Sequence, residues 1–139
     1  MKVYLAASMR GAGRNLQELR KVVEELKKSG LEVLTEAWIL NEVLDVDRGV
    51  PPEEIFERDL KALDDADVVL ADVNFPSLGV GFEIAYALLR GKRVVAFCRE
   101  DRARKLSALI LGITWPNFEL VTYSTVENLV TELLRRLFD

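Results

Sequence analysis

Residues 67–87 read DVVLADVNFPSLGVGFEIAYA and contain, in order, a strand, a turn and a helix. The first seven residues are almost continuously apolar, which is typical of a strand buried on both faces of a parallel sheet. Asn-Phe-Pro-Ser interrupts the strand, and the residues from Gly79 to Arg90 favour a helix. A parallel strand followed by a helix is the repeating unit of an α/β fold.

The same unit recurs along the whole chain. Apolar runs predict four more strands, and periodic segments predict helices between them and at the end, the last one capped by Ser124. The predicted strands are residues 2–7, 31–36, 92–98 and 118–123, and the other helices are residues 16–28, 52–66, 100–112 and 124–138. We therefore predict one α/β domain over residues 1–139, a doubly wound, flavodoxin-like (Rossmann-like) parallel sheet of five strands. Its expected strand order is 2-1-3-4-5, with helices on both faces.

The composition limits the chemistry of the protein. The chain has 139 residues, a net charge of −4 and no histidine, so Ser-His-Asp and Cys-His catalysis and a Cys/His zinc site are excluded. The negative balance gives no reason to expect nucleic acid as a partner, and no apolar run approaches the roughly 20 residues that span a bilayer. The single cysteine, Cys98, is expected in the core and fits a reducing, cytoplasmic location.

Glu83, near the start of the predicted 79–90 helix, has two interpretations. An acid in the first turn complements the helix dipole, with Ser77 as the N-cap and the glycines allowing close packing. Alternatively, the apolar neighbours Phe82 and Ile84 point to a buried acid with a catalytic role. Asp59 lies beside a buried stripe of the preceding helix and could converge with Glu83, which is the minimal pair for glycosidic chemistry.

The turn after the first strand is a second candidate site. The segment ASMRGAGRN (residues 7–15) is rich in glycine and carries Arg10 and Arg14 at a helix N-terminus, where a small anion such as a phosphate binds well. It matches neither a dinucleotide fingerprint nor a P-loop. A tight turn with solvated arginines is the other interpretation.

Three segments together resemble the 2'-deoxynucleoside 5'-phosphate N-hydrolase (Rcl) family, within the nucleoside 2-deoxyribosyltransferase superfamily. They are YLAASMRG, RDLKALDDADVVLADVNFPSLGVGFEIAYAL and KLSALILG, and the resemblance extends from Val3 to about Gly112. It implies hydrolysis of the N-glycosidic bond of 2'-deoxynucleoside 5'-monophosphates, without metal or cofactor. It also implies a homodimer with shared active sites.

The resemblance assigns roles to single residues. Glu83 matches the nucleophile that forms a covalent deoxyribosyl intermediate, Asp59 matches the group that assists departure of the base, and Tyr4 matches the tyrosine that places sugar and nucleophile. The implied phosphate site consists of Ala7, Ser8, Met9, Arg10, Gly11, Ser77 and Gly79, together with Ser107 from the neighbouring subunit.

The chain departs from the family pattern at the phosphate turn. Ala7 replaces a glycine, and an extra residue shifts Arg14. Three alternatives stay open beside the hydrolase: a deoxyribosyltransferase that exchanges bases, a nucleotide-binding module without catalysis, and flavodoxin-like electron transfer. The sequence does not indicate which base is preferred.

Overall fold

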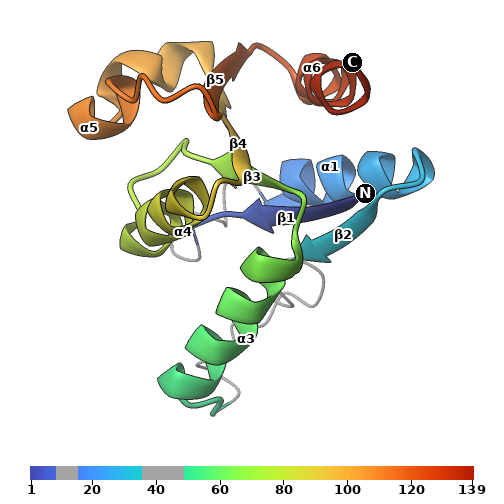
Figure 1. The fold of residues 1–139 in the computed structure, drawn as a ribbon. Helices are drawn as coiled ribbons and strands as arrows, with labels where there is room; N and C mark the ends of the chain where they lie inside the picture. The colour runs from blue at the N-terminus through green and yellow to red at the C-terminus, as the bar shows by residue number, and fades with distance from the viewer. Residues whose placement is uncertain (9–15, 36–48) are drawn as a thin grey trace.

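The computed structural model describes residues 1–8, 16–35 and 49–139. Five strands form one parallel sheet in the order β2-β1-β3-β4-β5, which confirms the predicted fold class and strand order (Figure 1). The strands are β1 (Lys2–Ala6), β2 (Glu32–Thr35), β3 (Val68–Asp72), β4 (Arg93–Arg99) and β5 (Phe118–Tyr123). The chain reverses its direction of travel across the sheet between β1 and β3, so the ligand crevice of such folds is expected at the carboxyl ends of these two strands.

The helices alternate with the strands, as predicted. They are α1 (Leu16–Lys28), α3 (Pro52–Asp65), α4 (Leu78–Leu89), the 3-10 helix η3 (Glu100–Lys105), the short α5 (Ala108–Leu111) and α6 (Val126–Phe138). Pro52 at the first position and the acids Glu53 and Glu54 behind it explain why α3 begins where it does.

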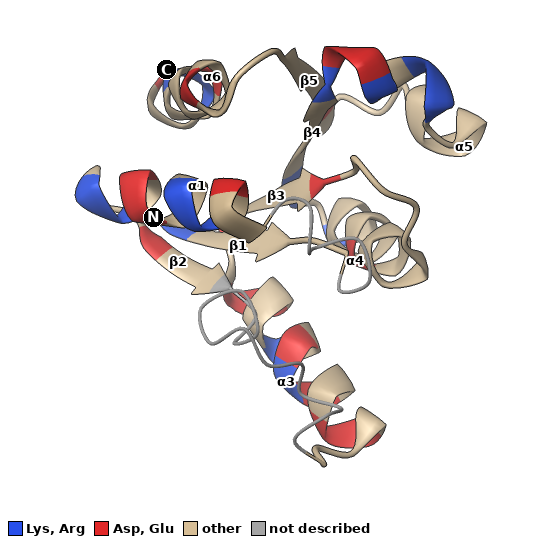
Figure 2. Cartoon of the chain, turned by 180° about the vertical axis from the view of Figure 1, so that it is seen from behind, with Lys and Arg blue, Asp and Glu red and all other residues tan. Residues whose placement is uncertain are grey.

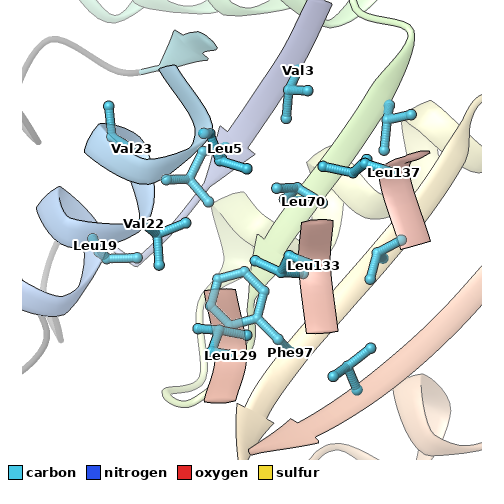
Figure 3. Close-up of a cluster of buried hydrophobic side chains, with 14 of the residues drawn as sticks. Val3, Leu5, Leu19, Val22, Val23, Leu70, Phe97, Leu129, Leu133 and Leu137 are labelled. Carbon is cyan, nitrogen blue, oxygen red and sulfur yellow. The ribbon is translucent and has the colours of Figure 1, made fainter. Parts of the chain in front are cut away.

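Helices α1 and α6 cover one face of the sheet (Figure 3). Leucine and valine recur on one stripe of each helix and are buried against β1, β3 and β4. The core of this face includes Val22, Leu26, Leu129, Leu133 and Leu137, with Leu5, Leu70 and Phe97 from the sheet. This face is a closed apolar layer.

Helices α3 and α4, with the η3–α5 segment beside them, cover the opposite face. Buried residues such as Val69, Ala71, Val80, Ile84 and Cys98 form this second core. Cys98 is therefore a core residue, as predicted, and burial raises the pKa of its thiol. Tyr4 belongs to this side of the sheet, because side chains alternate along β1 and its neighbours Val3 and Leu5 point to the other face.

Two local predictions were wrong. Residues 100–112 do not form one helix, because the backbone is extended at Leu106 and separates η3 from α5. The cap of α6 is Thr125 rather than Ser124: the Thr125 hydroxyl accepts from the backbone N–H of Asn128 at 3.1 Å. Ser124 and Thr125 are both good capping residues, so composition alone does not choose between them.

No helix within residues 1–8, 16–35 and 49–139 has the length and apolar character needed to cross a bilayer.

Candidate active site

Glu83 lies on the inner face of α4 and is 7% exposed. It is the only charged residue of this helix, and Figure 2 shows α4 without charge except for one acidic position. Its neighbours on the same face, Val80, Ile84 and Ala87, pack into the core below the sheet. Burial of a carboxylate among such residues costs free energy unless hydrogen bonds compensate for the lost water. The dipole-capping interpretation is wrong in one respect: α4 begins at Leu78 and has no acid in its first turn, so Glu83 lies in the second turn.

The hydroxyl of Tyr4 donates a hydrogen bond to Oε2 of Glu83. Tyr4 is 1% exposed in the middle of β1, and β1 pairs with β3, the strand that leads into α4. The rigid centre of the sheet thus holds the donor, and the first turns of α4 hold the acceptor. The geometry fixes the orientation of the carboxylate before any ligand binds.

Ser77 starts α4, with its hydroxyl accepting from the backbone N–H of Val80 at 3.2 Å. The N-cap interpretation of Ser77 is therefore correct. Close packing does not explain the two glycines that follow. A Cβ at Gly81 would meet no described atom within 4 Å, and one at Gly79 would meet only the Ser77 hydroxyl, at 3.8 Å. The absence of side chains instead leaves the first turn of α4 accessible to a ligand.

Asp59 lies on α3 and is half-buried, and Nε of Arg58 donates to its Oδ1 at 3.0 Å. The preceding turn of α3 carries Phe56 on the same side, since positions three apart share a helix face. The ring of Phe56 lies 6.1 Å from that of Phe82, the residue before Glu83. The structure therefore places Asp59 and Glu83 on two neighbouring helices, and their convergence on one substrate stays a prediction.

A second link between α3 and α4 lies about two turns further along α3 and about one turn further along α4. The hydroxyl of Tyr86 donates to Oδ1 of Asp64 at 2.7 Å, and this acceptor raises the pKa of Tyr86. Arg90 forms an ion pair with the same oxygen at 3.2 Å. Asp64 and Asp65 are exposed. These contacts fix the two helices relative to each other.

The predicted phosphate turn is only partly described. Ala7 and Ser8 follow β1 and are buried at 3% and 8%. Met9, Arg10, Gly11 and Arg14 lie outside the described residues.

A cleft of about 980 Å³ lies on the other side of α4, between this helix and the η3–α5 segment. Both Ser77 and Ser107 line it within one chain. Ser107 precedes α5, and its side chain makes no capping hydrogen bond. Glu83 is not among the lining residues, because it faces the sheet. Sequence reasoning missed this cleft: it predicted one helix over residues 100–112, whereas the backbone is extended at Leu106.

A buried polar network anchors the turn between β3 and α4, and it too was missed. Asn74 is 2% exposed. Its side-chain amide donates to Asp72 at 2.8 Å and to the Tyr123 hydroxyl at 3.0 Å. Its Oδ1 accepts from the backbone N–H of Arg99 at 2.9 Å. Burial raises the pKa of Tyr123, which keeps the phenol protonated and able to donate to Glu18. The signal in the sequence was a polar residue directly after a buried strand, at the edge where ligands bind.

Comparison with known proteins identifies the family of the chain. The family model for nucleoside 2-deoxyribosyltransferase matches residues 3–124. The chain belongs to this family. It is 51% identical over 133 residues to "Putative 2'-deoxynucleoside 5'-phosphate N-hydrolase 1" of Thermofilum pendens, covering 96% of this chain and 92% of that protein. It is 36% identical to the 5-hydroxymethyl-dUMP N-hydrolase of Mus musculus, covering 99% of this chain and 79% of the relative. These relatives confirm the resemblance noted in the sequence.

A solved structure shows the same fold. The CMP N-glycosidase of Clostridium botulinum superposes with a TM-score of 0.74 at 20% identity, covering 97% of this chain and 99% of the other. The fold described above is therefore shared with a protein of very different sequence.

Proposed function

We propose that the protein hydrolyses the N-glycosidic bond of 2'-deoxynucleoside 5'-monophosphates. The observation that carries this proposal is the buried pair of Tyr4 and Glu83, a carboxylate that is oriented by a phenol of the central strand β1. Family membership and the names of two relatives support the same reaction class. Since a glutamate and an aspartate suffice for glycosidic chemistry, the reaction also fits a chain without histidine.

The reaction proceeds in two displacements. A carboxylate oxygen of Glu83 attacks C1' of the sugar, and the C1'–N bond breaks with its electron pair moving to the base. Asp59 assists this departure by supporting protonation of the leaving base. Water then attacks C1' and displaces the carboxylate, which releases 2-deoxyribose 5-phosphate. The transition state resembles an oxocarbenium ion, and a carboxylate stabilises its positive charge.

In this proposal the 5'-phosphate binds between the glycine-containing segment that follows β1 and the glycine-containing start of α4. Ala7, Ser8, Met9, Arg10 and Gly11 form the first side of this proposed site. Ser77 and Gly79 form the second, and the accessible first turn of α4 supports their role, since a helix N-terminus attracts anions.

The functional unit that we propose is a homodimer in the cytoplasm. Apart from Glu83 on its inner face, helix α4 carries no charged side chain, and Leu78 and Leu89 on its outer face are 97% and 74% exposed. Leu109 of α5 and Trp115 after it add to this surface. An all-apolar helix is normally buried, and a second copy of the chain would bury this one. Ser107 would then contribute to the partner's phosphate site.

Product analysis tests the reaction. The protein is incubated with the four common deoxynucleoside monophosphates and 5-hydroxymethyl-dUMP, and free base and deoxyribose 5-phosphate are measured. Glu83→Gln keeps an acceptor for Tyr4 but removes the nucleophile, so turnover should fall by roughly 10⁴-fold or more. Glu127→Gln, an exposed change on α6, is the control. Unchanged turnover in Glu83→Gln would refute the nucleophile, and base exchange without hydrolysis would indicate a transferase.

A mixing experiment tests the shared site. Glu83→Gln and Ser107→Ala proteins are combined, and mixed dimers should contain one site with both native residues. Activity above the sum of the separate variants supports sharing. Purely additive activity, or a monomeric mass by light scattering, would refute it.

A further inference from the structure

The side chain of Asn74 uses its oxygen and both of its amide hydrogens inside the protein. Asn74 follows β3 and is 2% exposed. Its Nδ2 donates to Asp72 at 2.8 Å and to the Tyr123 hydroxyl at 3.0 Å. Its Oδ1 accepts from the backbone N–H of Arg99 at 2.9 Å. A backbone N–H can only donate, so the Arg99 contact fixes which end of the amide carries the oxygen.

The main chain of Asn74 is held as well. Its N–H donates to Oδ1 of Asp72 at 2.9 Å, and its carbonyl accepts from Nε of Arg102 at 3.0 Å. Contacts with Arg99, Tyr123 and Arg102 thus tie this one residue to β4, β5 and η3.

The same contacts extend to α1. Glu18, in the first turn of α1, forms an ion pair with Arg99 and accepts from the Tyr123 hydroxyl at 3.5 Å. The guanidinium carbon of Arg99 lies 5.4 Å from the centroid of the Tyr123 ring. A buried polar network whose members are hydrogen-bonded to one another is rigid. The turn before α4 is therefore held by three strands and two helices.

The start of α4 has little other support. Leu78 is 97% exposed, and Gly79 and Gly81 have no side chain that could pack. Among residues 78–81 only Val80 is buried. The position of the first turn of α4 therefore depends strongly on the turn that precedes it, and the hydrogen bonds of that turn converge on Asn74.

We propose that Asn74 is a positioning residue for the reaction: it fixes the turn from which α4 begins and thereby holds the Glu83 carboxylate against the Tyr4 hydroxyl. The assignment rests on the proposed function for the identity of the reaction. Glu83 lies in the second turn of α4, whereas Tyr4 is held separately by β1. A shift of the turn therefore moves one partner and not the other. A misplacement of about 1 Å can lower the rate of a reaction by about 100-fold.

The first test compares two asparagines that hold the two ends of α4. Nδ2 of Asn117 donates to the carbonyls of Leu88 and Lys92 at 3.2 and 2.8 Å, at the end of α4 far from Asn74. We expect Asn74→Ala to lower kcat by about 10- to 100-fold and Asn117→Ala to change it by less than about threefold. Equal losses in the two variants would overturn the proposal.

A milder variant serves if Asn74→Ala does not fold. Tyr123→Phe keeps the ring, which packs 6.2 Å from that of Phe97, but removes one acceptor of the Asn74 amide. Because the other contacts of Asn74 remain, kcat should fall by about 3- to 10-fold. An unchanged kcat in Tyr123→Phe would count against the network.

A pH profile distinguishes the hydrogen bonds of Asn74 from its bulk. Asn74→Asp keeps the shape and the acceptor for Arg99, but it places a second carboxyl group beside Asp72. Two carboxyl groups at this distance share a proton at low pH and repel each other once both are ionised. The kcat of Asn74→Asp relative to the native protein should therefore rise as the pH falls, and a ratio independent of pH would contradict the proposal. The other ionisable groups around this position are Cys98 and Arg99 of β4, Tyr123 of β5, Arg102 of η3 and Glu18 of α1.

Hydrogen exchange separates this proposal from the proposed function, because it needs no turnover. In Asn74→Ala the amides of residues 80–84, at the start of α4, should exchange faster than in the native protein and in Asn117→Ala. This result would support the positioning role even if the native protein hydrolysed no nucleotide. Native exchange rates at these amides in Asn74→Ala would overturn it, whatever the activity.

Discussion

Helices α1 and α6 bury one face of the sheet under continuous leucine and valine stripes, whereas α3, α4 and α5 leave large apolar side chains exposed on the other face. Figure 3 shows the first face as a layer of aliphatic side chains with Phe97 among them. The second face carries the buried Glu83, the half-buried Asp59 and the cleft with its basic residues. In the function proposed above, the first face contributes mainly to stability, and the second contributes the reacting groups and the surface for a second copy.

The largest effect on stability should come from truncating a buried side chain on the face that α1 and α6 cover. Leu133 of α6 is fully buried, so Leu133→Ala should lower the free energy of unfolding by about 2–5 kcal/mol. Urea denaturation measures this loss, and kcat of the folded protein should stay within a factor of two. A large fall in kcat under native conditions would show that the two faces are not independent.

The next effect should appear on the other face, where a substitution should lower kcat rather than stability. Tyr4→Phe removes only the hydroxyl that donates to Glu83, and kcat should fall by roughly 100-fold because the carboxylate is no longer oriented. This corresponds to about 2.7 kcal/mol of transition-state stabilisation. Steady-state kinetics at saturating substrate measures kcat, and denaturation of the same sample, as the control, measures its stability. An unchanged kcat would show that the Tyr4 hydroxyl does not contribute to catalysis.

A smaller effect should follow from charging the exposed surface of α4. Leu89 is 74% exposed and does not line the cleft. Leu89→Glu should raise the dissociation constant of the proposed dimer at least about tenfold, or by about 1.4 kcal/mol. Analytical ultracentrifugation over a dilution series measures it. Lys28→Glu on α1, outside this surface, should leave association unchanged.

The smallest effect should come from the cap of α6. Thr125→Ala removes the acceptor of the Asn128 N–H and should cost about 1 kcal/mol of stability without any change in kcat or KM. Ser124→Ala should cost less, because its side chain does not cap the helix. Thermal unfolding of the two variants side by side would contradict the assignment if Ser124→Ala were the more damaging change.

The fold was predictable because local patterns and global topology agree. Continuous apolar runs such as Val68–Asp72 identify buried parallel strands, and alternating strands and helices leave few topologies. Glu83 was predictable as a candidate because an acid among apolar helix residues is unusual. Its partner Tyr4 came from family resemblance alone, since no local pattern connects residues 79 positions apart.

The remaining features depend on side-chain geometry that the sequence does not encode locally. The break at Leu106 interrupts a segment with a good helical pattern, and residues on both sides of this break line the cleft. Arg102 is one of several charged residues in η3 (Figure 2), and its contacts with Asn74 and Phe75 appear only in the structure. Thr125 rather than Ser124 caps α6, because the helix begins one residue later than the sequence pattern predicted.

The hydrogen bond from Tyr4 to Glu83 also has a consequence for folding kinetics. It joins the first strand to a helix that follows the third, so it forms only after β1 and β3 have paired. Such non-local pairing is slow compared with helix formation. During refolding, helical circular dichroism should therefore recover before catalytic activity. The recovery of enzyme turnover would then report when β1 and β3 pair during refolding.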